Sequence, residues 1–352
     1  MHITHATDLH AWDDFLASQP WSPFLQSFTM GEVYQDIGQK PIRLVAELHG
    51  KIHGICFAHL VSARRGKHLS VPYGPVIDDA VNEHDATLMT KGFIDALVKE
   101  AKKLGCSFLR ISPFWMQGRH AAAEEALGSV QSPLHLLAEH VWYLPLRDAA
   151  GKLKNEEEIL MEMRKTTRNL IRRAERDGVT VRASKNPNEE LKYFLALHEE
   201  TRKRHGFTPY SDSFFTSQVN RFSKRNECTL YLAEYQGKVI SASIHMHCFG
   251  ETSYHHGASD STHSKIPASY LLQWTAICDA LKRGDSIYNF WGIAPLTPVP
   301  NPVPHPFSGV TLFKTGFGGQ ILNLVHCKDT PVTKAYWLTY AFERIRKWRR
   351  GF

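Results

Sequence analysis

The 352-residue sequence has no long apolar run and no closely spaced cysteine pair. No stretch reaches the roughly 18 consecutive apolar residues that a membrane-spanning helix needs. Residues 1–15 include Asp8, Asp13 and Asp14, which a secretory signal peptide would not contain. The six cysteines are scattered without a C-x-x-C motif, a pattern typical of buried thiols. We therefore expect a cytoplasmic protein with neither disulfides nor a cysteine zinc site.

Several nucleotide-binding and catalytic motifs are also missing. There is no G-x-x-x-x-G-K-[ST] loop for a nucleoside triphosphate and no G-x-G-x-x-G between a strand and a helix for a dinucleotide. H-E-x-x-H and G-x-S-x-G are absent as well. The sequence therefore gives no support to ATP-dependent chemistry, to nicotinamide or flavin redox chemistry, or to the common zinc protease and serine hydrolase mechanisms.

Acidic residues are in the minority. Asp and Glu number 35 against 42 Lys and Arg, which gives a formal net charge of +7 and favours anionic partners. The basic residues form two clusters, one within residues 164–176 and one within residues 344–350. Both clusters fall on expected helices, so each would present its charge along one element.

Hydrophobic residues make up 43% of the chain and charged residues 22%, the balance of a globular protein with a large core. At about 150 residues per domain, the length suggests about two domains. An internal repeat supports this division. Residues 46–52 and 233–239 share the pattern Ala-Glu-x-x-Gly-Lys followed by a β-branched residue, which is typical of two strands joined by a tight turn.

Each copy continues with two further strand-like segments, an amphipathic helix and a last strand. The helix is expected at about residues 85–104 in the first copy and 268–283 in the second. The last strands are expected at residues 107–111 and 286–290. A duplicated β-β-β-α-β unit explains both copies and predicts two α/β domains with mixed sheets. The unit resembles the GNAT acetyltransferase fold, but neither helix follows the glycine-rich turn with which those enzymes hold coenzyme A.

A mostly helical segment joins the two copies. Residues 155–177 are expected to form one helix, with Ile159, Met163 and Ile171 on its apolar side. The opposite side carries six basic residues: Arg164, Lys165, Arg168, Arg172, Arg173 and Arg176. Such a face is either an ordinary solvated surface or a row of cations that binds the phosphates of a nucleic acid.

Short motifs spread over most of the chain resemble the FemABX family, the aminoacyl-tRNA-dependent transferases that form peptidoglycan bridges and consist of two GNAT-like domains. The motifs are Phe24-Leu25-Gln26-Ser27, Tyr73-Gly74-Pro75-Val76, Arg164-Lys165 with Arg168 to Ala174, Gly178-Val179, His256-Gly257-Ala258-Ser259, Tyr288 to Ile293 and Leu312 to Gly319. No long coiled-coil arm interrupts the middle segment, so the chain is similar to the compact members of this family.

The resemblance implies a division of the chain into three parts. The first GNAT-like domain is expected at residues 1–150, and the second at residues 151–330, including the basic helix 155–177. A basic amphipathic helix is expected at residues 331–352. In fold class the protein is thus expected to be α/β (α+β), with tandem GNAT-like acyltransferase domains.

The resemblance also implies a reaction. An amino group on the stem peptide of a peptidoglycan precursor, lipid-linked or nucleotide-linked, attacks the ester carbonyl of an aminoacyl-tRNA and forms an amide. Such an ester is already activated, so no cofactor is expected. The family's reaction centre contains a Phe-Lys pair, which matches Phe313-Lys314 here, and the lysine would offer a cation to the oxyanion or to the tRNA terminus. The substrate-binding residues that we expect are Arg164, Lys165, Arg168, Arg172, Tyr73, Tyr254, Ser259 and Trp291.

The chain departs from the family pattern at two places. A lysine that follows the N-terminal Gly-Glu pair in many members is replaced here, since Glu32 precedes Val33. Many relatives have an aspartate where this chain has Ser112, so no general base is assigned. Two other functions therefore stay open: a GNAT-like acyltransferase that uses a thioester donor on a sugar or amino acid, and a non-catalytic relative that binds tRNA or the precursor.

Three further features have alternative interpretations. His245, His247, His255 and His256 lie on expected strands without a completing carboxylate or cysteine, so no metal is expected there. The C-terminal stripe of Trp337, Ala341, Ile345 and Trp348 either packs on the second domain or lies on the inner face of an anionic membrane. Six prolines within residues 295–306 predict a stiff segment, either a lid or a connector.

Overall fold

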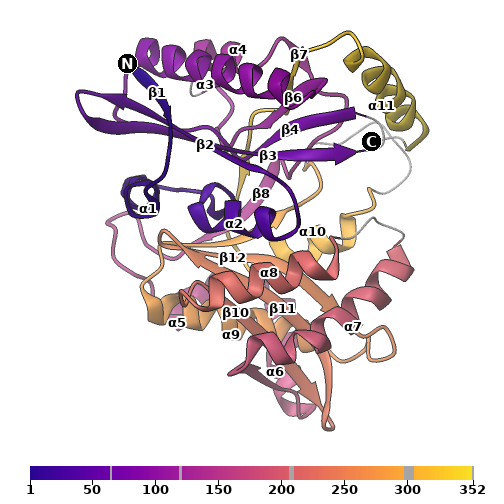
Figure 1. The fold of residues 1–352 in the computed structure, drawn as a ribbon. Coiled ribbons are helices and arrows are strands. Elements are labelled where there is room, and N and C mark those ends of the chain that lie inside the picture. The colour runs from indigo at the N-terminus through magenta and orange to yellow at the C-terminus, as the bar shows by residue number, and fades with distance from the viewer. Residues whose placement is uncertain (64–65, 119–120, 206–209, 297–304, 351–352) are drawn as a thin grey trace. The chain divides into compact units, whose positions relative to one another are not determined.

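The computed structural model describes residues 1–63, 66–118, 121–205, 210–296 and 305–350. The chain forms two compact units, one of residues 1–139 with 323–352 and one of residues 140–322. Figure 1 follows the chain through both units by colour.

A mixed sheet forms the first unit, with the strand order β1-β2-β3-β4-β6-β15-β7 and β5 paired to β3. Its strands are β1 His2–His5, β2 Pro41–Leu48, β3 Lys51–Ala63, β4 Gly66–Pro72, β5 Val76–Ile77, β6 Phe108–Ser112, β7 Val130–Gln131 and β15 Lys328–Pro331. β4 and β6 pair in parallel because the helix α3 (Glu83–Lys103) crosses over between them. The other pairs among the described strands of this sheet are antiparallel.

Helices cover both faces of this sheet (Figure 1). α3 begins at the side-chain cap of Asn82 and buries Phe93 and Leu97 against sheet residues such as Leu44 and Leu109. On the opposite face, Tyr34 of α2 stacks on Phe57 of β3 with 5.8 Å between ring centroids. The helices of this unit are α1 Leu9–Ser18, the short 3-10 helix Phe24–Gln26, α2 Phe28–Asp36, α3, α4 Ala121–Leu127 and α11 Tyr336–Arg350.

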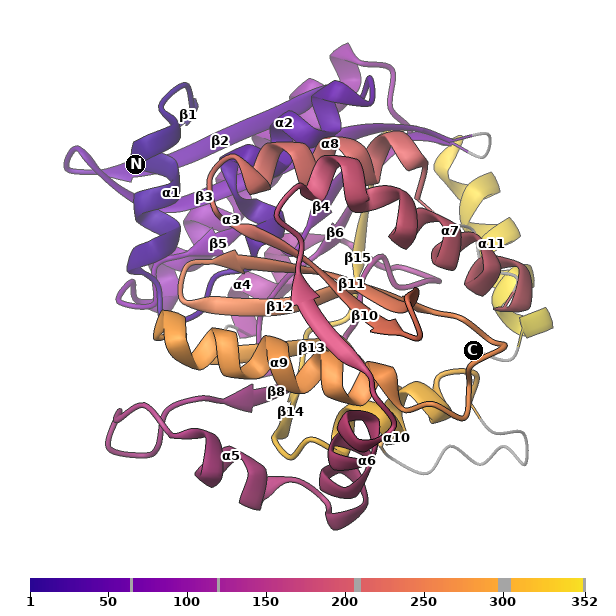
Figure 2. The same ribbon diagram turned by 90° about the horizontal axis from the view of Figure 1, so that it is seen from below.

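The second unit has a seven-stranded sheet in the order β14-β8-β13-β12-β11-β10-β9. Its strands are β8 His140–Pro145, β9 Thr180–Ala183, β10 Cys228–Tyr235, β11 Lys238–Cys248, β12 Glu251–Ser259, β13 Ile287–Gly292 and β14 Gln320–Asn323. Its helices are α5 Glu156–Glu162, α6 Lys165–Arg176, α7 Pro187–His205, α8 Asp212–Ser223, α9 Ala268–Arg283 and α10 Ser308–Thr315. Figure 2 shows the sheet between α7 and α8 on one face and α9 with α6 on the other.

The internal repeat predicted from the sequence is confirmed in its backbone geometry. The two tight turns have matching left-handed residues, with φ of 51° and 76° at His49 and Gly50 and again at Gln236 and Gly237. A β-bulge follows Ala46 in the first copy and Ala233 in the second. In the second copy the crossover helix α9 again links a parallel pair, β12 and β13. Two mixed-sheet GNAT-like units, as expected, therefore make up the chain.

The units divide the chain differently from the boundaries at residues 150 and 330. β8 belongs to the second sheet, where it pairs antiparallel with β13. β15 belongs to the first sheet, where it pairs antiparallel with β6. Each sheet is thus extended beyond the β-β-β-α-β repeat by a strand from outside that repeat, and these additional strands determine the unit boundaries.

The C-terminal helix begins at Tyr336, later than the expected residue 331, and belongs to the first unit. On this helix Trp337, Ile345 and Trp348 are 52%, 53% and 82% exposed, and whether the stripe packs on the second domain or on a membrane stays a prediction. The helix is held by other residues, since Tyr336 is fully buried and Glu343 binds Arg110 of β6. None of the helices in the described part of the chain is long and apolar enough to cross a membrane.

Candidate functional site

The Phe-Lys pair lies on α10, a two-turn helix of the second unit, and β14 follows it after a glycine-rich turn. Gly318 and Gly319 have φ of 84° and 93°, a region that side chains with a Cβ rarely adopt. A Cβ on Gly319 would also lie 2.3 Å from the carbonyl oxygen of Tyr143 on β8. The indole of Trp142 donates to the Gly318 carbonyl at 2.7 Å. The two glycines therefore let this turn lie directly on β8, which fixes α10 and its lysine.

Lys314 is buried, with 7% of its surface exposed, although its side chain carries an amine. The Nζ atom donates a 2.6 Å hydrogen bond to the backbone carbonyl of Gly292 at the end of β13. It also lies 5.8 Å from the ring centroid of Tyr254 on β12. Burial disfavours the ammonium form and lowers the pKa of Lys314 to about 7. The amine can therefore gain or lose a proton near neutral pH, unlike an ordinary surface lysine.

A bulge in β13 presents the Gly292 carbonyl. The register with β8 shifts between Asn289 and Trp291, and Trp291 has a φ of 68°, which is unusual for a bulky residue. The buried Asn289 holds this conformation, because its side-chain oxygen accepts a 2.7 Å hydrogen bond from the Trp291 amide. The Tyr288 to Ile293 motif thus builds the backbone that orients Lys314.

Tyr254 is another neighbour of Lys314. Its hydroxyl lies over Gly257, where an added Cβ would be only 1.9 Å away. Its ring stacks on His245 at 5.4 Å, and burial raises its pKa to about 12, so the phenol stays neutral. Gly257 in the His256 to Ser259 motif is therefore explained by the ring that covers it.

Phe313 packs inward beside the lysine. Its ring lies 4.9 Å from that of Tyr270 on α9 and 5.4 Å from that of Phe317. This aromatic cluster anchors α10 to α9. Phe313 thus holds the position of Lys314 in this structure.

The expected helix at residues 155–177 is two helices rather than one. α5 ends at Glu162, and the next residue, Met163, has an extended ψ of 152°. α6 begins at Lys165, after Arg164. A residue distant in the sequence fixes this break, because the Arg164 amide donates to the Gly316 carbonyl at 2.9 Å. The Arg164 guanidinium reaches Thr315 at 3.1 Å. The break therefore attaches the start of α6 directly to the Lys314 segment.

The basic face of α6 is exposed. Lys165, Arg172 and Arg176 are solvent-exposed, as the sequence predicted for a cationic face. An open hollow of about 580 Å³ lies on this helix, and its lining consists of Thr166, Asn169, Leu170, Arg172, Arg173 and Arg176. Arg173 has local partners in this structure, Asp177 at 3.2 Å and the Lys265 carbonyl at 3.2 Å.

Arg168 does not belong to the exposed basic face of α6. Its guanidinium donates to the carbonyls of Leu160 and Met163 at 3.1 and 2.6 Å, and so it binds the last turn of α5. Its role in this structure is to close the break between the two helices. The periodicity placed Arg168 with the other cations because it assumed one continuous helix.

The other expected substrate-binding residues have different positions. Tyr254, Trp291 and Arg164 belong to the surroundings of the Lys314 segment, whereas Ser259 ends β12 and is partly exposed. Tyr73 lies in the first unit, fully buried, with its hydroxyl donating to the Ala138 carbonyl at 2.8 Å. The structure thus brings together three of the expected residues around Lys314. The structure also shows that the Gly292 carbonyl accepts from Lys314, a role that no sequence motif can reveal because every residue has a carbonyl.

Motifs of the first unit meet one another as well. The buried side chain of Gln26 donates to the Pro72 carbonyl at 2.6 Å and accepts from the Phe57 amide at 2.8 Å. A Cβ on Gly74 would lie 2.6 Å from this side chain. The Phe24 to Ser27 motif and the Tyr73 to Val76 motif therefore meet at one contact, which joins the middle of β3 to the end of β4.

Two of the strand histidines, His245 and His247, have hydrogen-bond partners on other strands of the same sheet. His245 shares a 2.8 Å hydrogen bond with the Tyr288 hydroxyl, and His247 shares one of 2.7 Å with Thr229. Burial lowers the pKa of His247 to about 3, so it is neutral. All six cysteine thiols are buried, as expected. Most of the proline-rich segment, residues 297–304, lies outside the described residues, so its interpretation as a lid or a connector stays open.

Comparisons with known proteins agree with this architecture. Residues 161–295 match the family model described as acetyltransferase (GNAT) domain. No curated protein matches the sequence. The fold is similar to the crystal structure of FemX, with a TM-score of 0.76 at 18% identity over 97% of this chain and 100% of that one.

Two further solved structures have a similar fold. L-PGS from Bacillus licheniformis has a TM-score of 0.55 at 13% identity, with 96% of each chain covered. A tandem GNAT protein from the clavulanic acid biosynthesis pathway also has a TM-score of 0.55 at 13% identity, over 94% of this chain and 98% of that one.

These similarities identify an acyltransferase architecture. The GNAT match falls on the unit that contains Lys314, and the likeness to FemX extends over nearly the whole chain. The chain is a tandem GNAT-fold protein with the fold of FemX, and the resemblance to the FemABX family is confirmed at the level of the fold.

Proposed function

We propose that the protein is an aminoacyltransferase that moves an amino acid from aminoacyl-tRNA to the stem peptide of a peptidoglycan precursor. The observation that carries the proposal is Lys314, a buried amine with a pKa of about 7 on the same unit as an exposed basic helix. The lysine suits a reaction in which negative charge develops on a carbonyl oxygen. The basic helix suits a polyanionic carrier.

The proposed chemistry needs no added activation. The substrate amine attacks the ester carbonyl, so a C–N bond forms while negative charge develops on the carbonyl oxygen. The ammonium form of Lys314 stabilises this oxyanion in a site that largely excludes water. When the C–O bond to the terminal ribose breaks, the hydroxyl of the tRNA leaves with a proton and the amide nitrogen has lost one.

The exposed cations of α6 supply the proposed site for the tRNA backbone. Arg172 and Arg176 are four residues apart and therefore lie on one side of the helix, about 6 Å apart along its axis. Arg164, the residue directly before α6, is hydrogen-bonded to Thr315 and links this surface to the Lys314 segment. A tRNA bound along α6 would thus bring its acceptor end toward the buried amine.

A lipid-linked acceptor is the form that the C-terminal helix supports. Trp337, Leu338 and Trp348 are exposed on α11, and Arg344, Lys347 and Arg349 are exposed beside them. Large apolar side chains next to cations suit the surface of an anionic membrane. The helix would hold the enzyme where a membrane-embedded precursor presents its peptide.

Transfer of radiolabelled amino acids from a mixed pool of charged tRNA tests the proposal. The acceptors are lipid-linked and nucleotide-linked muropeptide precursors in parallel reactions. Label should enter one of these precursors as an alkali-stable amide. Label that enters an acceptor only from an acyl-CoA thioester would instead support the thioester acyltransferase.

A further inference from the structure

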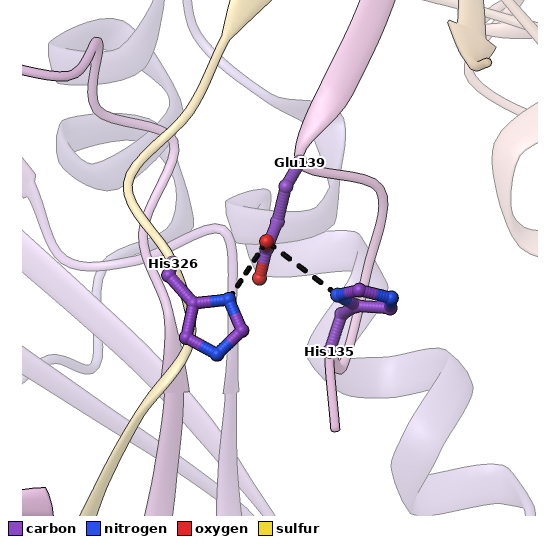
Figure 3. A group of neighbouring side chains, drawn as sticks. All are labelled: His135, Glu139 and His326. Atoms are coloured by element: carbon purple, nitrogen blue, oxygen red, sulfur yellow. Dashed lines mark hydrogen bonds and ion pairs between the residues drawn. The ribbon is translucent and has the colours of Figure 1, made fainter. Parts of the chain in front are cut away.

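A second group of polar side chains belongs to the first unit, whereas Lys314 and α6 belong to the second. His135 and Glu139 belong to the loop of residues 132–139 between β7 and β8, and His326 lies in the segment before β15. One ligand atom from each residue lies within 4.8 Å of the other two. Figure 3 shows the two imidazoles approaching the same carboxylate from two sides.

The distances suit a tetrahedral metal ion. The Nδ1 atom of His326 lies 2.8 Å from Oε2 of Glu139, and Nδ1 of His135 lies 3.5 Å from the same oxygen. Zinc bonds to imidazole nitrogen and carboxylate oxygen of about 2.0 to 2.2 Å place neighbouring tetrahedral ligands about 3.3 Å apart. The observed separations lie on either side of that value, so small side-chain rotations would complete the geometry.

Other groups orient two of the three ligands. The Nε2 atom of His326 is 2.9 Å from the Ser132 carbonyl, which can only accept, so this nitrogen carries a hydrogen. In the neutral ring, Nδ1 then presents its lone pair to the Glu139 carboxylate. The other oxygen of Glu139 accepts from the Cys327 amide at 3.0 Å. Support of this kind, a carbonyl behind the imidazole and a donor behind the carboxylate, is common around metal ligands.

A lone pair and a carboxylate oxygen 2.8 Å apart repel each other unless a positive ion lies between them. That ion is either a proton, which makes His326 an imidazolium, or a metal. A metal between them would bind the lone pair of His326 and the carboxylate oxygen of Glu139 together.

We propose that His135, Glu139 and His326 form a binding site for a zinc-class transition-metal dication. Two imidazoles and one carboxylate favour such ions over magnesium and calcium, which prefer oxygen ligands. His135 is the exposed ligand, with 56% of its side chain accessible, so the fourth coordination position opens to solvent. An occupied site would join the loop of residues 132–139 to a segment about 190 residues later in the chain.

Titration of the untagged, chelator-treated full chain with ZnCl2 against a chromophoric chelator tests the proposal. The wild type should bind one equivalent of Zn²⁺ that His135→Ala and Glu139→Gln each weaken about 100-fold or more. His84→Ala, which removes an exposed histidine outside the cluster, should bind as the wild type does. This control is needed because the chain contains 20 histidines.

Two further measurements keep the test decisive if a variant is unstable. Co²⁺ should give the wild type the intense visible bands of a tetrahedral complex, and these bands should be absent from His135→Ala. Because the His135 side chain is exposed, this variant should keep the circular dichroism spectrum of the wild type. Zn²⁺ should raise the Tm of the wild type and leave that of His135→Ala unchanged. The proposal is overturned if the wild type binds no equivalent, or if His135→Ala and Glu139→Gln bind Zn²⁺ as tightly as His84→Ala.

Discussion

At the scale of single residues, Lys314 determines how the proposed activity depends on pH. Its pKa of about 7 means that the ammonium form, which stabilises the oxyanion, is lost as the pH rises above 7. We therefore expect kcat/KM to fall on the alkaline side with a midpoint near 7. Lys314→Arg should be slower overall but keep its rate up to about pH 9, because arginine stays charged. Initial rates across this pH range check the expectation, and the same alkaline decline in both proteins would contradict it.

Lys314 should also reduce the stability of the fold. Its pKa is about 7 in the folded protein and 10.5 in the unfolded chain, so the unfolded state binds more protons between these values. Stability should therefore rise with pH from 7 to about 10 and be lowest below 7. Lys314→Met should raise the free energy of unfolding at pH 6 by about 2 kcal/mol, because it removes a buried charge. Denaturant unfolding at pH 6 and 9.5 measures this. A variant less stable than wild type at pH 6 would show that the Gly292 hydrogen bond outweighs burial.

Sequence motifs predicted some of these residues and not others. Phe313 and Lys314 could be named as candidates from the family resemblance, because the glycines after them make the segment recognisable, and their catalytic role stays a prediction. Gly292 could not, since it contributes only a carbonyl, which every residue has. Glu139 and His326 gave no signal either, because they lie far apart in the sequence and only the fold brings them together.

At the scale of elements, the exposed face of α6 should bind nucleic acid. Replacing Arg172 and Arg176 together by Glu should weaken tRNA binding about tenfold or more and reduce the slope of log Kd against log salt by about 2. Lys91→Glu together with Lys99→Glu, both exposed on α3, makes the same change in net charge without touching this face. Filter binding across a salt series distinguishes the two variants. Equal losses in both would mean that only net charge matters.

The α11 helix should bind anionic membranes through its exposed apolar residues. Trp337→Ala with Trp348→Ala should abolish sedimentation with vesicles that contain phosphatidylglycerol, whereas the wild type should sediment. Leu88→Ala removes an exposed apolar residue from α3 and should behave as the wild type does. Sedimentation of the double variant at the wild-type level would exclude α11 as the membrane contact.

Local patterns determined which elements could be predicted. The bounds of α9 agree with the expectation, because its apolar periodicity is clear and Gly284 ends it in the left-handed conformation. The break between α5 and α6 was missed, because neither Met163 nor Arg164 is a helix breaker. That break depends on the Gly316 carbonyl, which is distant in sequence.

At the scale of the whole molecule, the repeat was predictable and the boundaries were not. The turns at Gly50 and Gly237 repeat a recognisable sequence, so the duplication could be inferred. β8 and β15 are six and four residues long, and their pairing partners lie far away in the chain. Short strands with non-local partners carry little periodicity, and for this reason the boundaries were placed at residues 150 and 330 instead of 139 and 322.

The central claim is that the whole chain transfers an aminoacyl group at Lys314. The most direct measurement is the single-turnover rate of amide formation from a saturating charged tRNA, for wild type and Lys314→Ala. We expect the variant to bind both substrates normally and to react about 10² to 10³ times more slowly. A variant that reacts within about threefold of the wild type would contradict the assignment of Lys314, and the absence of any amide product from the wild type would contradict the proposed reaction.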